Sequence, residues 1–156
     1  MASLPGRETP EAGVKRDGYA ANPSLKNQKE DSMNQTPTPV SEYAAIDRTI
    51  QHYIDGARTG SGQTMAHAFH ADATIFGYIG SDLFAGPIQK LFEWNDANGP
   101  SSDLAARITS LDVVGTTAVA RLEIENWTGH RFTDFFTLLK VEGDWKITNK
   151  VFHLHA

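Results

Sequence analysis

Residues 131–155, RFTDFFTLLKVEGDWKITNKVFHLH, decide the fold of this chain. Their pattern predicts two long strands joined by a tight turn at Glu142-Gly143-Asp144. Side chains alternate between the two faces of a strand, so one face of the first strand carries Phe132, Asp134, Phe136 and Leu138. The opposite face carries Thr133, Phe135, Thr137 and Leu139. Both faces are largely apolar, and we expect another layer of the protein to cover the face that holds Asp134.

Asp134 is the residue of this stretch that points to a function. Burying an unpaired carboxylate is costly, so a fold keeps one only with a hydrogen-bond partner, in a protonated form, or for a use. Two interpretations stay open: a neutral acid that donates a hydrogen bond to a ligand, and a structural carboxyl bonded to Tyr53 or to a tryptophan. Aromatic neighbours predict a raised pKa for Asp134, because no basic residue shares its strand face. Arg121 or Lys150 would lower this pKa instead if either pointed inward from a neighbouring strand.

The first 40 residues differ from the rest of the chain. They lack apolar periodicity, are rich in Pro, Gly and Asn, and carry five basic and five acidic residues, a pattern typical of a disordered leader. Met33 stands just before the periodic part, so translation starting there is a second hypothesis, which mass spectrometry of the native N-terminus would test. Residues 41–156 then form one predicted domain, which carries the whole net charge of −5.

Composition excludes several classes of function. An acidic domain without a basic stripe is a poor binder of nucleic acid. The chain has no cysteine, which removes disulfides, thiol nucleophiles and cysteine-bound zinc. No stretch approaches the roughly 20 apolar residues that span a bilayer. We therefore expect a cytoplasmic protein without a nucleic-acid partner, a membrane partner or a cofactor.

The order of the predicted elements is helices first and strands afterwards. Three- and four-residue spacing predicts helices over Ser41–Thr59, capped by Ser41, and over 63–69. A short hairpin, Thr74–Tyr78 with Leu83–Ala85, precedes a third helix that opens at Gly86-Pro87 and ends at Asn98-Gly99-Pro100. From Leu104 onward the pattern alternates, and turns at Gly115, Thr128-Gly129 and Gly143 separate four long strands. This order predicts an α+β fold with the helices on one face of a curved sheet.

These features resemble the nuclear transport factor 2-like superfamily, and within it the SnoaL-like and putative lumazine-binding branch. The resemblance rests on the order of elements, the corner FHADAT at residues 69–74, the helix start at Gly86-Pro87, and the closing hairpin DFFTLLKVEGDWKITNKVF. It covers Ser41 to His155. It implies a cone-shaped curved antiparallel sheet packed on three N-terminal helices, the cystatin-like architecture. This fold hosts many functions, so the likeness predicts a scaffold more strongly than an activity.

The ketosteroid isomerases of this superfamily hold a steroid between an aspartate base and an oxyanion hole made by a tyrosine and a protonated aspartic acid. The resemblance places Tyr53 at that tyrosine and Asp134 at the protonated acid. Further aromatic positions of the pocket fall on Phe69, Trp94 and Phe152. Gly77 occupies the position of the base, and the neighbouring Phe76 cannot accept a proton. We therefore do not expect isomerisation of a keto-steroid by this route.

The histidines and the surplus of aromatic residues offer further candidates. Metal binding by His67, His70, His153 and His155 is not favoured, because spacing alone supports it, whereas a lone His70 could act as a base or cap the corner. We expect the pocket to be lined by Phe69, Phe76, Trp94, Trp127, Phe136 and Phe152. Phe135, Leu139 and Val141 face away from Asp134 and predict a homodimer joined through the sheets.

Three functions are consistent with this set of residues. The first is a domain that binds a small hydrophobic or aromatic ligand, without catalysis. The second is an isomerase, dehydratase or polyketide cyclase-like enzyme, in which Asp134 or His70 moves a proton and Tyr53 polarises a carbonyl. The third is a dimerisation or scaffold module with a filled cone, which predicts no cavity beside Asp134.

Overall fold

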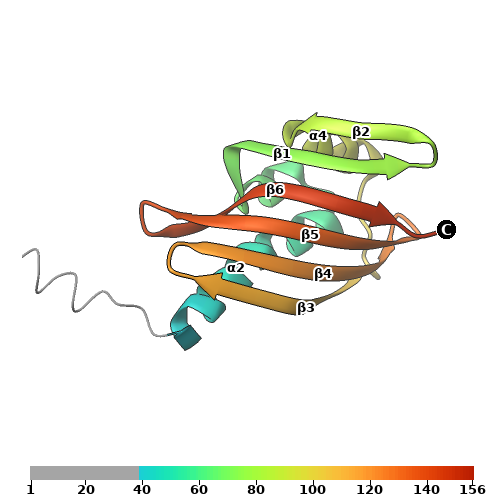
Figure 1. The fold of residues 1–156 in the computed structure, drawn as a ribbon. Helices are drawn as coiled ribbons and strands as arrows, with labels where there is room; N and C mark the ends of the chain where they lie inside the picture. Colours follow the sequence, from blue (N-terminus) through green and yellow to red (C-terminus); the bar gives the residue numbers. More distant parts are fainter. Residues whose placement is uncertain (1–38) are drawn as a thin grey trace, which may run out of the picture. The chain divides into compact units, whose positions relative to one another are not determined.

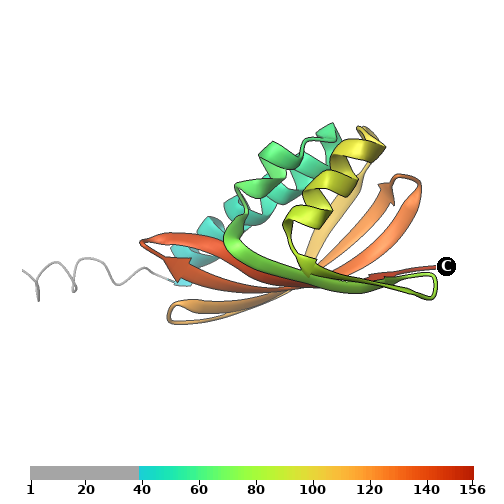
Figure 2. The same ribbon diagram turned by 90° about the horizontal axis from the view of Figure 1, so that it is seen from above.

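The computed structural model describes residues 39–156, and the predicted leader and the start at Met33 lie outside the described residues. Three helices pack on one face of a six-stranded sheet (Figures 1 and 2). The elements are α2 (Pro39–Thr59), α3 (Gly62–Ala66), β1 (Phe69–Ile79), β2 (Asp82–Pro87), α4 (Gln89–Asn98), β3 (Ala105–Val114), β4 (Thr117–Trp127), β5 (His130–Val141) and β6 (Asp144–Leu154). The predicted α+β class and its cone-like curved sheet are confirmed.

The sheet has the strand order β2-β1-β6-β5-β4-β3, so the last strand lies at its centre. Four neighbouring pairs are antiparallel, as the hairpin turns predict, but β1 and β6 run parallel. A parallel pair needs a long connection, and here the chain between β1 and β6 includes α4 and four strands. The expectation of a purely antiparallel sheet is therefore corrected at this one pair.

Helix α2 covers the centre of the sheet with its apolar face. Ile46, Ile50, Tyr53 and Ala57 recur at three- and four-residue spacing and are all fully buried. The helix includes Pro39, so Ser41 lies inside it and is not the predicted cap. Proline is tolerated in the first turn of a helix, where its missing N–H has no partner to lose.

Both shorter helices differ from their predicted limits because neighbouring residues join the sheet. The second helix ends at Ala66, since Phe69 already pairs with Ile147 of β6. The third helix begins after Gly86 and Pro87, because these residues pair with β1 as the end of β2. Its C-cap is Gly99, whose φ of 73° is easily adopted only by glycine.

A bulge in β6 decides which of its side chains face the helices. Leu138 pairs with Ile147 and Thr137 pairs with Asn149, so Thr148 is an extra residue without a partner on β5. An extra residue of this kind reverses the alternation of a strand. Trp145 and Ile147 face inward before the bulge, and Lys150 and Phe152 face inward after it.

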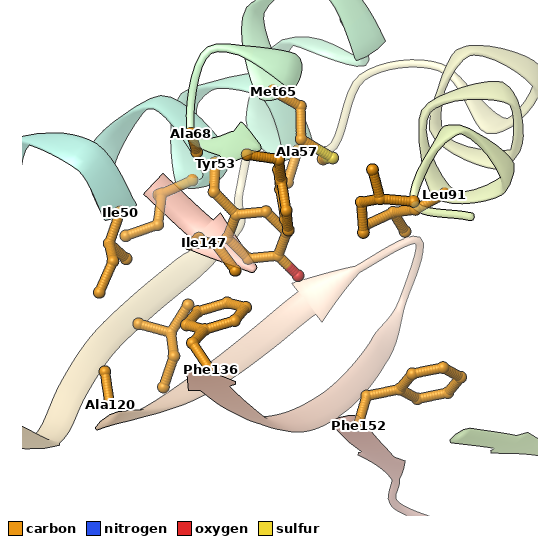
Figure 3. Close-up of a cluster of buried hydrophobic side chains, with 14 of the residues drawn as sticks. Ile50, Tyr53, Ala57, Met65, Ala68, Leu91, Ala120, Phe136, Ile147 and Phe152 are labelled. Atoms are coloured by element: carbon orange, nitrogen blue, oxygen red, sulfur yellow. The ribbon is translucent and has the colours of Figure 1, made fainter. Parts of the chain in front are cut away.

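The core lies between the helices and the inner face of the sheet, and Figure 3 shows part of it. The inner face of β5 is confirmed: Phe132, Asp134, Phe136 and Leu138 are buried. Among residues 39–156, no helix has the length and apolar character needed to cross a membrane.

Candidate functional site

Three polar side chains meet inside this apolar core: Tyr53 from α2, Asp134 from β5 and Lys150 from β6. The Tyr53 hydroxyl donates a hydrogen bond to Asp134 Oδ2 over 2.6 Å. Lys150 Nζ donates to the Tyr53 hydroxyl oxygen over 2.7 Å and lies 3.5 Å from Asp134 Oδ1. Tyr53 and Asp134 are 0% exposed and Lys150 is 1% exposed. The predicted contact between Tyr53 and Asp134 therefore exists, and Lys150, one of the two basic residues that could point inward, joins it.

Aromatic rings surround the ammonium group of Lys150. Its Nζ lies 5.0 Å from the centre of the Tyr53 ring, 4.9 Å from that of Trp127 and 5.3 Å from that of Phe152. Such distances allow attraction between a cation and the faces of the rings. Lys150 reaches this position because the bulge at Thr148 turns it inward. Lys150 Nζ, which is removed from water, thus has one hydrogen bond, to Tyr53, an ion-pair contact with Asp134 and three aromatic rings around it.

Burial controls the ionisation of the three groups. It raises the pKa of Asp134 above its usual range, against Lys150 and the Tyr53 hydrogen bond, which act to lower it. It lowers the pKa of Lys150, against the attraction of Asp134. It also raises the pKa of Tyr53 well above its usual range, so the phenol keeps its proton. The predicted direction for Asp134 therefore agrees with the structure, although an inward cation does oppose it.

One oxygen of Asp134 can still accept hydrogen bonds. Among the described residues none donates a hydrogen bond to Asp134 Oδ1, although this atom is fully buried. Lys150 Nζ stands at ion-pair distance from it without forming a hydrogen bond. A buried oxygen in this condition is unusual and is often found where a ligand or water completes the site.

Lys150 also lies on the wall of a cavity between α4 and the β1–β2 end of the sheet. The other side chains that line it are apolar: Ile75, Ile79, Phe84, Leu91, Trp94, Trp127, Phe132 and Phe152. The free space inside this slot is ≈ 20 Å³, about the room of one water-sized sphere, so an organic molecule enters only when lining side chains move. In Figure 3 the Tyr53 hydroxyl points toward the space between Leu91 and Phe152, both of which line the cavity. The site therefore combines an apolar slot with a single amine at its inner end.

The sequence matches the family described as "Putative lumazine-binding" over residues 41–153, which include Tyr53, Asp134 and Lys150. The chain belongs to this family. The predicted branch of the nuclear transport factor 2-like superfamily is thereby confirmed.

A named relative and two solved structures are also similar to this chain. Aldolase FrzH from Cladobotryum sp. is 32% identical over 114 residues, which cover 72% of this chain and 91% of that protein. A nuclear transport factor 2-like protein of unknown function from Methylobacillus flagellatus KT has a TM-score of 0.74 and 50% identity, covering 76% of this chain and 96% of that one. Another from Shewanella baltica OS155 has a TM-score of 0.74 and 42% identity, covering 78% and 99%.

Most of the aromatic residues predicted to line the pocket lie around the site. Trp94, Trp127 and Phe152 line the cavity. Phe69 and Phe136 lie deeper, where their ring centres are 5.8 Å and 5.2 Å from that of Tyr53. They hold the tyrosine in place and do not line the cavity.

Two predicted site residues do not join this cluster. Phe76 is 45% exposed and points to the outer face of β1, because the neighbouring Ile75 points inward. His70 is half-exposed at the start of β1, where its Nδ1 accepts a hydrogen bond from the backbone N–H of Asp72. His70 thus fixes the corner, and the inward-facing Lys150 is the additional titratable group of the pocket.

The four histidines weighed as metal ligands lie toward different ends of the sheet. His67 and His70 flank Phe69, which pairs with Ile147 of β6, whereas His153 lies six residues further along the same strand. At about 3.3 Å per residue this is roughly 20 Å. The structure does not bring the two pairs together.

Gly77 explains why the pocket has no carboxylate at the position of the isomerase base. The ring of Phe152 lies directly against the α-carbon of Gly77, where a β-carbon would overlap the ring. Glycine is therefore required for this ring position. Phe152 thus fills the space from which a side chain at residue 77 would have reached the pocket.

Proposed function

We propose that the domain binds a small, partly apolar organic molecule in the cavity beside Lys150. The observation that carries this proposal is the buried group of Tyr53, Asp134 and Lys150 at the inner end of an apolar slot. Ligand sites are commonly apolar with a few well-placed polar groups, and this site has that composition. An oxygen of the ligand would accept a hydrogen bond from Lys150, while Trp94 and Phe152 would contact its apolar body. The description of the family as putative lumazine-binding supports a flat ligand.

The slot is narrow, and its mouth decides what enters. Phe84 and Trp94 are half-buried and Ile79 is 38% exposed, so the outer wall has room to move. Lys150, Trp127 and Phe132 at the inner end are buried on all sides. We therefore expect the outer side chains to shift when a ligand binds, while the inner end keeps its form.

A ligand panel tests this proposal. Pterins, including lumazine, and flavins, steroids and aromatic polyketides are screened by thermal shift, and hits are confirmed by quenching of tryptophan fluorescence. The expected result is stabilisation that Ile79→Trp, which narrows the mouth, abolishes. Val119→Trp is the matched control, because Val119 is 53% exposed on β4 and does not line the cavity. Binding that survives Ile79→Trp unchanged, or no binding by any compound, would contradict the proposal.

A second candidate is an enzyme that moves protons on a carbonyl compound. Two observations favour it: Lys150, hydrogen-bonded to Tyr53, can donate a proton at the cavity wall, and a relative that is 32% identical is named an aldolase. Asp134 would support both groups from behind. General acid–base groups contribute about a hundredfold to ten-thousandfold each, so Lys150→Met should reduce turnover of any substrate found by at least that lower factor. Unchanged turnover would leave the site as a binding site alone.

We also propose that the domain forms a homodimer through the outer face of its sheet. A row of paired residues crosses four strands on this face: Phe76, Val151, Phe135 and Arg121. The three apolar members are 44–48% exposed, and all three helices lie on the other face (Figure 2). Contiguous exposed apolar surface of this kind is typical of protein interfaces.

Measuring the oligomeric state tests the proposed dimer surface. Sedimentation velocity is measured for the wild type, for Phe135→Lys in the centre of the row, and for the control Val114→Lys. Val114 is 77% exposed at the end of β3, outside the row. A dimer that only Phe135→Lys dissociates is expected, whereas a monomeric wild type would refute the proposal.

A further inference from the structure

We propose that Lys150 forms a covalent imine with an aldehyde or ketone that enters the cavity. This inference rests on the proposed function, because it requires that the cavity admits a small organic molecule. It adds a chemical class of ligand, carbonyl compounds, and a bond that noncovalent binding does not need.

The position of Lys150 distinguishes it from the other lysines of the described domain. Lys140 Nζ is paired with Glu42, and Lys90 and Lys146 donate to backbone carbonyl oxygens at positions where water also reaches them. Lys150 Nζ alone among these four is buried at the wall of an apolar cavity. A carbonyl compound in the cavity would therefore meet one amine.

The surroundings of Lys150 favour its reactive, neutral form. The titratable groups that face it are Asp134 from β5 and Tyr53 from α2. The neighbouring side chains of α4, β1, β2 and β4 in the cavity wall are apolar: Leu91, Trp94, Ile75, Ile79, Phe84 and Trp127. Desolvation lowers the pKa of Lys150, and lysines in apolar pockets are activated as nucleophiles in this way.

The neutral form of Lys150 needs no change in the total number of protons that Lys150 and Asp134 hold together. When Lys150 is an uncharged amine, its proton resides on Asp134, whose pKa burial raises. The amine can still donate one N–H to the Tyr53 oxygen, and Tyr53 can still donate to Asp134 Oδ2. No hydrogen bond of the group is lost when the proton moves.

The proton that Asp134 holds is then used in forming the imine. The lone pair of Lys150 attacks the carbonyl carbon, a C–N bond forms, and a proton passes from nitrogen to the former carbonyl oxygen to give a carbinolamine. Asp134 then donates its proton to this hydroxyl, the C–O bond breaks, and water leaves. The products are a protonated imine on Lys150, one water and the Asp134 carboxylate. The carboxylate is then placed to pair with the cationic imine, since the Asp134 Oδ1 and Lys150 Nζ atoms are 3.5 Å apart.

Trapping of the imine by reduction in the wild-type protein tests the proposal directly. The full chain is incubated near pH 7 with butanone or phenylacetaldehyde, reduced with cyanoborohydride, digested and mapped by mass spectrometry. The adduct adds the mass of the carbonyl compound less one oxygen. Labelling of Lys150 should exceed that of Lys146, because a lowered pKa raises the fraction of Lys150 that is free amine. Equal or weaker labelling of Lys150 would overturn the proposal, and this comparison needs no variant.

Variants separate the imine from noncovalent binding. Lys150→Arg keeps the charge but cannot form an imine, and Lys146→Arg is the matched control on the same strand. We expect Lys150→Arg to abolish trapping and Lys146→Arg to leave the label on Lys150 unchanged. If the same carbonyl compound quenches tryptophan fluorescence in the wild type without a trapped adduct at Lys150, the imine is refuted and the binding function stands. If neither signal appears, both fail.

Discussion

Replacing Lys150 by methionine should make the stability of the domain strongly dependent on pH. The substitution keeps the length and apolar stem of the side chain but removes the amine that faces Asp134 at 3.5 Å. The carboxyl group, which is 0% exposed, is then left with Tyr53 as its partner. It must stay protonated or remain buried as an unpaired charge.

The magnitude follows from the ordinary pKa of an aspartate. A carboxyl group whose folded pKa is raised stabilises the fold below its unfolded pKa, about 3.9, and loses this contribution as pH rises through the folded pKa. Each pH unit in this window costs about 1.4 kcal/mol. Between pH 4 and pH 7 Lys150→Met should therefore lose up to about 4 kcal/mol relative to wild type. In wild type the Lys150–Asp134 pair holds one proton in total near neutral pH, as does the unfolded chain, so the pair adds no such slope.

Replacing Asp134 in place of Lys150 should reverse the dependence of stability on pH. Asp134→Asn leaves Lys150 buried without a counter-ion, and its folded pKa is lowered further. A base of this kind contributes stability above its unfolded pKa, about 10.4, and loses it as pH falls through the folded pKa. Stability relative to wild type should therefore rise with pH for Asp134→Asn and fall with pH for Lys150→Met. The double variant should be close to wild type at every pH, since replacing both members of a buried ion pair is often neutral.

Urea unfolding of the four proteins at several pH values from 4 to 8 measures these differences. Residual solvent access through the mouth of the cavity reduces the magnitudes without changing their signs. Single variants whose stabilities differ from wild type by the same amount at all pH values would refute the reasoning. In that case neither group is desolvated, and the account of Lys150 as an activated amine fails with it.

Two further substitutions test the packing around the site. Gly77→Ala should destabilise the fold by about 1–3 kcal/mol in chemical denaturation, because its methyl group overlaps the Phe152 ring; full stability would show that the ring is free to move. Asn95→Leu should cost about 1–3 kcal/mol, because Asn95 Oδ1 accepts a 3.3 Å hydrogen bond from the buried Trp127 Nε1, which would be left without an acceptor. A neutral Asn95→Leu variant would show that the Trp127 indole finds another partner.

Regular alternation made the inner face of the sheet predictable. The buried set Phe132, Asp134, Phe136 and Leu138 follows from a strand without irregularity, and β5 has its regular pattern there. The contact between Tyr53 and Asp134 could also be predicted, because two buried polar groups on facing elements require hydrogen-bond partners. These parts of the site depend on local pattern and on the need to satisfy buried groups.

Errors arose where the sheet is irregular or where alternation was not applied strictly. Counting by twos from the buried Trp145 places Asn149 inward and Lys150 outward, and the bulge at Thr148 reverses this. Phe152 offered a signal, since a residue two before an inward aromatic shares its face. Phe76 was predicted for the pocket although it adjoins Gly77, whose position points inward, so simple alternation would have placed it outside.

The glycine and the bulge together change what chemistry the cavity can perform. The resemblance to the ketosteroid isomerases places their carboxylate base at the position of Gly77, and here the Phe152 ring fills that space. The bulge that turns Phe152 inward also turns Lys150 inward, two residues before it on the same strand. One irregularity in β6 therefore leaves no room for a base from β1 and supplies an amine from β6. Because a single backbone feature has both effects, removing the extra residue at Thr148 should expel Lys150 and Phe152 together, and no single side-chain substitution can restore the isomerase arrangement.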